Sequence, residues 1–217
     1  MTGRPRVAVI DYGIGNLRSA EKAIQRQGGD AFLTTDPAAI AAADAVVLPG
    51  VGAFGACMRA LREAGLEPAV RTAAASGRPF LGICVGMQML FDGSEEDPAV
   101  AGLGIIPGTV VWIPAGVKRP QMQWNRLVIE RDDEPMLTGL GAEPWMYFVH
   151  SLHGVPADAS DVVASCDYGG RLNVAFRRGS VFATQFHPEK SGEWGLALLT
   201  NFVRITASQA AEQRGEG

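Results

Sequence analysis

Two hydrophobic patterns alternate along the first half of the chain. Short, continuous apolar runs predict buried strands at Arg6 to Asp11, Ala31 to Thr34, Ala45 to Leu48 and Pro79 to Ile83. Helical patterns lie between these runs. One begins after a capping Asn16 and ends at Gly28-Gly29, one covers Met58 to Ala75 and is bent or broken at Pro68, and one covers Val85 to Phe91. Strands separated by helices predict a parallel sheet that is covered on both faces.

The second half is richer in strands that are separated by short turns. The strand-like segments are Thr109 to Ile113, Leu127 to Glu130, Met146 to Ser151, Asp161 to Ser165, Asn173 to Arg177 and Ser180 to Gln185. They predict antiparallel strands added at one edge, and a last helix at Trp194 to Ile205 returns to cover a face. The fold class is therefore α/β, a flavodoxin-like doubly wound sheet. We expect one domain over residues 1–206 and a frayed polar tail over 207–217.

Composition narrows the range of functions. A net charge of -4 and a pI near 5.4 give no reason to expect nucleic acid or an anionic membrane as partner, and Arg177-Arg178 is interpreted as a solvated turn. The apolar run Val7 to Ile10, after Met1-Thr2, is too short for a signal peptide, so we expect a cytoplasmic protein. Three cysteines without CxxC spacing predict neither disulfides nor a metal site.

Cys84 stands in the pattern Gly82-x-Cys84-x-Gly86, between an apolar strand and a helix. A sharp turn of this kind exposes its central residue at the carboxyl edge of the sheet, and the glycines permit close backbone approach. The N–H groups at the start of the following helix favour negative charge on the sulfur, and the N–H of Val85 can donate to an oxyanion. We interpret Cys84 as a nucleophile; the alternative is a buried cysteine at a strand end.

A nucleophilic cysteine needs a base, and the chain has three histidines. His187 ends a strand, and Glu189 lies two residues further on, so an extended backbone would point both side chains the same way. Glu189 could then fix the tautomer of His187. His150 closes an apolar run and is interpreted as a structural histidine, whereas His153 is expected to be exposed in a loop.

Two glycine-containing segments require separate interpretations. Pro49-Gly50-Val51-Gly52 follows a strand and could present a second N–H to an oxyanion, although an ordinary glycine turn would look the same. Gly13-Ile14-Gly15 lacks the third glycine of a dinucleotide fingerprint, because Arg18 occupies that place. No nucleotide or other cofactor is therefore expected.

These segments together resemble the triad-type glutamine amidotransferases, and in particular the glutaminase subunits of imidazole glycerol phosphate synthase. The matching segments cover nearly the whole chain: Asp11 to Asn16, Pro49 to Gly55, Gly82 to Gln88, Pro120 to Asn125, Tyr147 to Ser151 and Gln185 to Ser191. The resemblance implies that Cys84, His187 and Glu189 hydrolyse glutamine through a glutamyl thioester. It implies that Val51, Gly52 and Val85 form the oxyanion hole, and that Gly50, Gln88, Glu96 and Ser151 bind the substrate.

The resemblance also implies a partner, a (βα)8-barrel cyclase subunit that receives the ammonia in histidine biosynthesis. Asn16, Met122, Trp124 and Lys190 match family positions at that interface in the heterodimer. One departure is Gln123, where the family usually has glycine, which implies an altered loop at the interface. Three alternatives remain: another hydrolase with a nucleophile turn on a flavodoxin-like sheet, a glutaminase of another pathway, and a non-catalytic scaffold.

Overall fold

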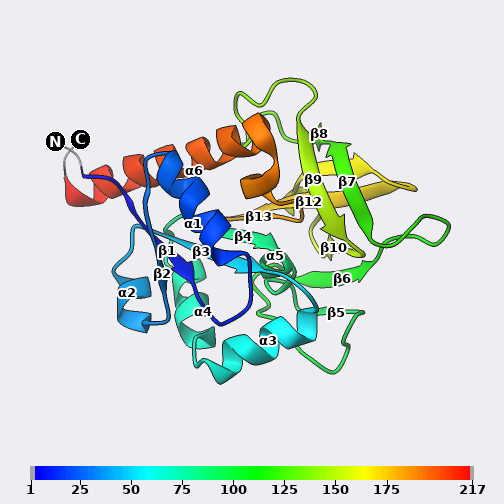
Figure 1. Cartoon of the computed structure of the whole chain (residues 1–217), viewed down its shortest axis with the longest axis horizontal. Coiled ribbons are helices and arrows are strands. Elements are labelled where there is room, and N and C mark those ends of the chain that lie inside the picture. Colours follow the sequence, from blue (N-terminus) through cyan, green and yellow to red (C-terminus); the bar gives the residue numbers. More distant parts are fainter. Residues whose placement is uncertain (1–2, 216–217) are drawn as a thin grey trace.

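A computed structural model describes residues 3–215, and its centre is an eight-stranded sheet (Figure 1). The strands lie in the order β2 (Asp30–Thr34), β1 (Arg6–Ile10), β3 (Ala45–Gly50), β4 (Phe80–Cys84), β13 (Val181–Thr184), β12 (Arg171–Arg178), β11 (Val162–Asp167) and β8 (Val128–Ile129). The first five pair in parallel and the last three are antiparallel. The predicted α/β class, with a parallel core and antiparallel strands at one edge, is confirmed.

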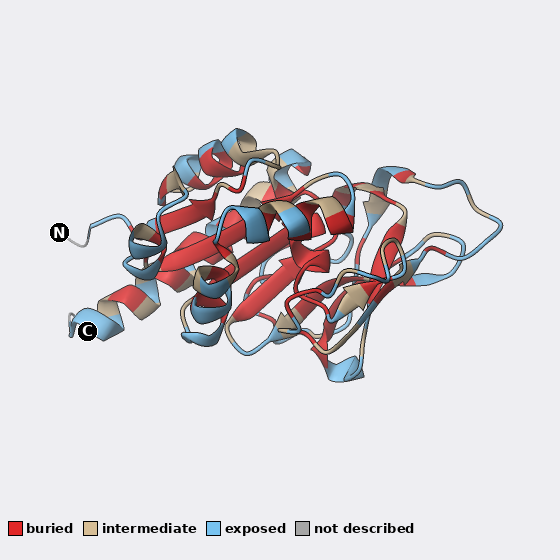
Figure 2. Ribbon diagram, turned by 90° about the horizontal axis from the view of Figure 1, so that it is seen from below, coloured by how far each residue is buried: buried red, intermediate tan, exposed pale blue. Residues whose placement is uncertain are grey.

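Helices cover both faces because the right-handed crossovers run in opposite directions from β1. The helices are α1 (Leu17–Arg26), α2 (Pro37–Ala41), α3 (Phe54–Glu63), α4 (Glu67–Ala75), α5 (Val85–Gln88) and α6 (Gly192–Arg214). Helices α1 and α6 pack together on one face, while α2 and α4 pack together on the other. The parallel strands between them are almost entirely buried, as Figure 2 shows in red, and this matches their continuous apolar runs.

Two small sheets lie beside the antiparallel edge. One joins β10 (Leu152–Pro156), β6 (Gly108–Trp112) and β5 (Gly93–Ser94), and the other is a ribbon of β7 (Gln121–Arg126) and β9 (Trp145–His150). Two 3-10 helices, η1 (Ala159–Asp161) and η2 (Pro188–Lys190), complete the secondary structure of residues 3–215. Of these elements, α2, β5, β7, β10 and the two 3-10 helices have no counterpart among the sequence predictions.

Several sequence predictions about the helices are wrong in detail. Asn16 makes no side-chain cap. The helix predicted over Met58 to Ala75 is interrupted as expected, but the break lies at residues 64–66, and Pro68 stands in the first turn of the second helix. Helix α5 ends at Gln88, after which the chain continues through hydrogen-bonded turns. Helix α6 runs on to Arg214, so residues 207–214 are helical rather than a frayed tail. The polar residues there are compatible with a helix that is packed on one side only.

Two predictions about exposure are also wrong. His153 is 8% exposed and lies in β10, because the apolar pattern around it belongs to a strand and not to a loop. Arg177 and Arg178 end β12 instead of forming a turn, and Arg177 pairs with the buried carboxylate of Glu134. Residues 1–2 and 216–217, on which the predicted amino-terminal segment and tail partly fall, lie outside the described residues. None of the helices in residues 3–215 is both long and apolar enough to cross a membrane.

Candidate active site

Cys84 ends β4 with a backbone φ of 56° and ψ of -116°. Among the described residues, it is the only one other than glycine with a positive φ. A positive φ costs an L-residue about 1 to 3 kcal/mol, and such strain is found where a side chain must be presented to a site. Steric contacts explain why glycine occupies two positions around Cys84. A Cβ on Gly86 would lie 1.9 Å from the carbonyl oxygen of Leu48, and one on Gly82 would lie 2.9 Å from the side chain of Leu90. The turn predicted from the sequence is therefore present.

His187 follows β13, whose parallel pairing with β4 brings the two strand ends side by side. Its Nδ1 lies 2.8 Å from Oε1 of Glu189, and both side chains are 2% exposed. Glu189 reaches the ring from the 3-10 helix η2, not from an extended strand as the sequence suggested. Since the ring Nδ1 faces a carboxylate, the proton on that nitrogen is fixed, and Nε2 is left for chemistry.

The backbone of His187 is held on both sides. Its N–H donates to the carbonyl of Tyr147 in β9 at 3.1 Å, and its carbonyl accepts the Ser191 hydroxyl at 2.6 Å. The same hydroxyl accepts the N–H of Tyr147 at 3.0 Å. Ser191 is fully buried, so these hydrogen bonds join β9 to the segment that carries the histidine. Apart from the nearness of Ser191 to His187, no sequence pattern indicates this contact.

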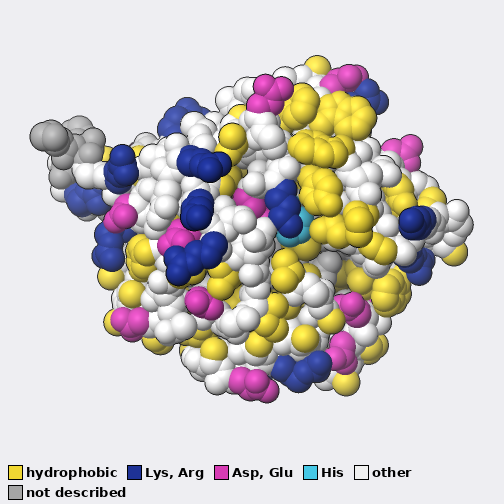
Figure 3. All heavy atoms as spheres, in the orientation of Figure 1, with side chains coloured by type: hydrophobic (Ala, Val, Ile, Leu, Met, Phe, Trp, Pro, Cys, Tyr) yellow, Lys and Arg dark blue, Asp and Glu magenta, His cyan; other side chains and the backbone are white. Residues whose placement is uncertain are grey.

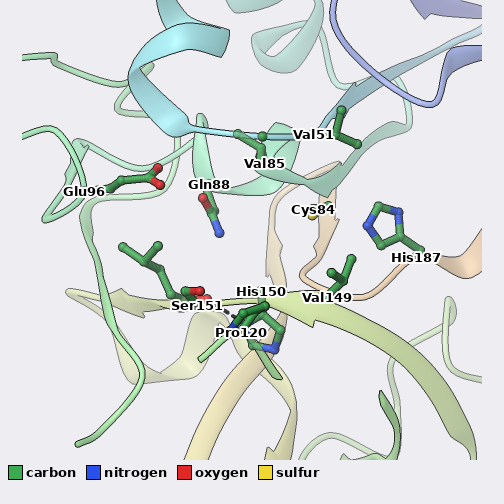
Figure 4. Close-up of a pocket in the computed structure, with 12 residues that line it drawn as sticks. Val51, Cys84, Val85, Gln88, Glu96, Pro120, Val149, His150, Ser151 and His187 are labelled. Atoms are coloured by element: carbon green, nitrogen blue, oxygen red, sulfur yellow. Dashed lines mark hydrogen bonds between the residues drawn. The ribbon is translucent and has the colours of Figure 1, made fainter. Parts of the chain in front are cut away.

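A cavity of about 320 Å³ opens at this point, within the range of small-molecule sites (Figure 4). Its lining includes most of the residues that the sequence predicted for catalysis, the oxyanion hole and the substrate, namely Val51, Gly52, Cys84, Val85, Gln88, Glu96, Ser151 and His187. Gly50 lies behind it, where a Cβ would meet the N of Gly86 at 2.6 Å. The lining also has Pro120, Val149, His150 and Leu152, which were not predicted as site residues.

The electrostatics of the cavity favour a charged His187. Burial would lower the pKa of His187, but hydrogen bonds and charges from Cys84 and Glu189 raise it to about 10. The Nε2 atom makes no hydrogen bond of regular geometry with the described residues, although it is buried. An unsatisfied buried ring nitrogen is costly, and at the wall of a cavity beside a thiol it indicates a group that handles protons.

His150 has a different environment, although it also lines the cavity. Its Nδ1 lies 2.7 Å from the carbonyl oxygen of Leu152, and its Nε2 lies 2.9 Å from Oε1 of Gln121. Burial lowers its pKa to about 4, so the ring is neutral at pH 7. Both nitrogens are occupied by protein groups, which agrees with the structural role predicted for His150.

Gln185 is a residue of the site that the sequence reasoning missed. It is fully buried, its Oε1 accepts the amide of Gln88 at 3.0 Å, and its Nε2 lies 3.8 Å from the sulfur of Cys84. The available signal was the strand period, because Gln185 lies two residues before His187 on an extended segment. Gln185 thus links Cys84, the predicted nucleophile, to a residue predicted to bind substrate.

The residues predicted for the subunit interface lie outside the cavity. Met122 and Trp124 are 62% and 44% exposed on β7, and Trp124 packs edge-on against Tyr147 of β9. Figure 3 shows hydrophobic side chains gathered on the face where β7 and β9 lie. Lys190 is exposed at the end of η2, and Asn16 is partly buried before α1. Gln123 is exposed in a regular strand and pairs with Phe148, so it alters no loop.

Comparison with known proteins agrees with this geometry. The chain matches the glutamine amidotransferase class-I family over residues 8–205. It is 49% identical over 205 residues to "Imidazole glycerol phosphate synthase subunit HisH" of Synechococcus sp. (strain JA-3-3Ab), covering 93% of this chain and 94% of that protein. The protein of the same name from Methanothermobacter thermautotrophicus is 50% identical over 199 residues, covering 92% and 98%.

Solved structures share the fold. A "glutamine amidotransferase" crystal structure superposes with a TM-score of 0.73 at 24% identity, covering 92% of this chain and 98% of that one. The "Structure of PurLQS from Thermotoga maritima" gives a TM-score of 0.75 at 22% identity, covering 93% and 98%. The chain is thus an enzyme of the class-I glutamine amidotransferase family and, within it, belongs with the subunits named HisH.

Proposed function

We propose that the chain hydrolyses glutamine, with Cys84 as nucleophile, His187 as proton carrier and Glu189 as the group that orients the imidazole. The observation that carries the proposal is the buried, unsatisfied Nε2 of His187 at the wall of the cavity that also exposes Cys84. With Nδ1 held by Glu189, the ring can exchange a proton only through Nε2. A protonated His187 beside the sulfur favours the thiolate, which is the reactive form.

The reaction then has two halves. The thiolate attacks the side-chain amide carbon, a C–S bond forms, and the carbonyl oxygen becomes an oxyanion that accepts N–H groups of Val85 and of Val51 or Gly52. His187 donates its proton to the nitrogen as the C–N bond breaks, which releases ammonia and leaves a glutamyl thioester. Water attacks the thioester, His187 accepts the proton from it, and glutamate leaves as the thiolate is restored.

The polar groups along the cavity suit the amino-acid end of glutamine. Glu96 can receive the ammonium group, and its position is fixed because its Oε2 accepts the N–H of Phe54 at 2.7 Å. The amide of Gln88, together with backbone at Gly50 and Ser151, can bind the carboxylate. In Figure 4 Gln88 and Glu96 lie along the cavity from Cys84 and His187, as an extended substrate requires.

We further propose that the ammonia is used by a second subunit, because the relatives are named as subunits of imidazole glycerol phosphate synthase. That partner would be a (βα)8-barrel cyclase, in a cytoplasmic heterodimer that makes imidazole glycerol phosphate for histidine biosynthesis. The exposed side chains of Met122 and Trp124 support this proposal, since large apolar groups in a cluster are typical of a covered surface. Asn16 and Lys190 would lie at the same interface.

The isolated chain should be a poor glutaminase that the partner activates. Gly50 and Gly52 permit a peptide to rotate, so that an oxyanion donor can point away from the cavity when no partner is bound. One missing donor lowers turnover by about 10² to 10³. Partner binding would recover this factor if the partner binds more tightly to the state in which the donor points into the cavity.

The test is Cys84→Ala in the complex with the cyclase encoded in the same genome. Glutamate release should be abolished, while product formation from added ammonium should persist, because the cyclase chemistry lies in the other subunit. Cys166→Ala is the matched control, since Cys166 is an equally buried cysteine that lies in β11, outside the cavity. Residual glutaminase activity of Cys84→Ala within tenfold of wild type would overturn the assignment.

A further inference from the structure

Two side chains outside the catalytic set hold the backbone of Pro49-Gly50-Val51-Gly52. The hydroxyl of Tyr12 donates to the carbonyl of Pro49 at 2.8 Å, and the thiol of Cys57 donates to the carbonyl of Val51 at 3.3 Å. Tyr12 comes from the loop after β1 and Cys57 from α3, so the segment is anchored from two separate elements. Tyr12 is 5% exposed and Cys57 is fully buried.

Both donors keep their protons at neutral pH. Burial raises the pKa of Tyr12 well above its usual value. Burial also raises the pKa of Cys57, in spite of opposing hydrogen bonds with Tyr12 and Val51, and a charge on Cys84 raises it further. A thiolate on the nucleophile therefore keeps Cys57 in the S–H form that can donate. Cys57 is an anchor and not a second nucleophile.

The two anchors act on alternate peptide units. A planar peptide fixes the N–H when its carbonyl is fixed, so Tyr12 sets the Pro49–Gly50 unit and Cys57 sets the Val51–Gly52 unit. Among the described residues, no side chain hydrogen-bonds the Gly50–Val51 unit that lies between them, although Gly50 still pairs with Cys84 at the end of β3. The backbone has little room to shift as a whole, because a Cβ on Gly50 would meet the Tyr12 hydroxyl at 2.9 Å.

We propose that Tyr12 and Cys57 are positioning residues for the oxyanion hole. They hold the peptide units before and after the Gly50–Val51 peptide, so that motion is confined to this peptide, which carries the Val51 N–H. The inference rests on the proposed function, because it assigns this segment a role in stabilising the oxyanion. Without the anchors the donor is less well oriented, and the loss falls on the transition state rather than on substrate binding.

The experiment compares Tyr12→Phe, Cys57→Ala and the double variant in the complex with the cyclase. Each single change removes one hydrogen bond and should lower kcat of glutaminase by about threefold to tenfold, with KM within about twofold of wild type. The double variant should lose less than the product of the two factors, since both side chains restrain one segment. Cys166→Ala controls for removal of a buried thiol elsewhere and should retain the wild-type kcat.

A second measurement separates positioning from damage to the nucleophile. Iodoacetamide alkylates a thiolate by displacing iodide and forms no oxyanion, so the rate of alkylation at Cys84, followed by peptide mass spectrometry, should not change. An unchanged kcat in both single variants, or alkylation that falls in parallel with kcat, would overturn the inference. If Tyr12→Phe fails to fold, Cys57→Ala decides alone. Wild-type complex without glutaminase activity would refute the proposed function instead.

Discussion

The substitution Gly86→Ala tests how closely the nucleophile turn is packed. Gly86 is the second residue of α5 and lies two residues after Cys84. Its α-carbon faces Leu48 and Pro49 of β3. An added Cβ would lie 1.9 Å from the carbonyl oxygen of Leu48 and 2.8 Å from its carbonyl carbon. Both atoms belong to the backbone of a buried strand, so neither can rotate away.

The size of the effect follows from that distance. Real Cβ atoms essentially never approach a heavy atom closer than 3.0 Å, so the turn must retreat from β3 by about 1 Å. A displacement of 1 Å at a catalytic group costs about 10² in rate. Overpacking of this kind also destabilises a protein by about 1 to 3 kcal/mol. We expect glutaminase kcat/KM to fall by about 10², with the protein still folded at 25 °C.

The assay is glutamate release by the complex, together with urea unfolding of each chain. Gly82→Ala is the matched control, because its Cβ would meet the flexible end of the Leu90 side chain at 2.9 Å, with backbone no closer than 3.2 Å. It should lose much less activity at a similar cost in stability. Equal activity in the two variants, or full activity in Gly86→Ala, would refute the argument that the turn is fixed by contact with β3.

Three further outcomes are expected. Arg177→Ala removes the closer of the two arginine partners of the fully buried Glu134 carboxylate, leaving Arg131 at 3.9 Å, and should lower the free energy of unfolding by about 3 kcal/mol in urea titrations. The pKa of His187 is raised from 6.5 to about 10. The protonated ring therefore contributes its full stabilisation of the folded protein below pH 6.5, and this contribution is lost as the pH rises through 10. The wild type should therefore lose stability relative to His187→Asn between pH 7 and 10, and a constant difference would contradict the assigned charge. Trp124→Ser should weaken binding of the cyclase by at least tenfold in titration calorimetry, whereas Trp112→Ser, an equally exposed tryptophan on β6, should not.

The strands of the core could be predicted because burial on both faces leaves a continuous apolar run. Strands β1, β3 and β4 differ from their predictions by at most two residues at either end. The Cys84 turn was also predictable, since the glycine pattern around Cys84 is visible in the sequence, and a Cβ on Gly86 would meet the backbone of Leu48. These features depend on interactions that are local in the sequence or on a simple period.

The elements and contacts that were not predicted from the sequence depend on interactions between distant segments. Strand β7 has the polar sequence Gln121 to Arg126 and exists because it pairs with β9, whose apolar pattern is clear. The pairing of Arg177 with Glu134 joins residues 43 positions apart, and no local pattern at either one indicates it. The hydrogen bonds from Tyr12 and Cys57 to the Pro49–Gly52 segment are of the same kind.

The site contains features that reduce stability, and the sheet beneath it compensates for them. The positive φ of Cys84 costs about 1 to 3 kcal/mol, and burial of the His187 ring opposes the charge that Cys84 and Glu189 favour. Cys84 ends β4 and His187 follows β13, two neighbouring strands of the parallel core, and β4 is buried along its whole length between β3 and β13. A strained turn at an edge strand could relax by fraying, whereas at the centre of the sheet the neighbouring strands hold it in place. The position of Cys84 in the middle of the sheet is thus what allows its strained geometry to persist.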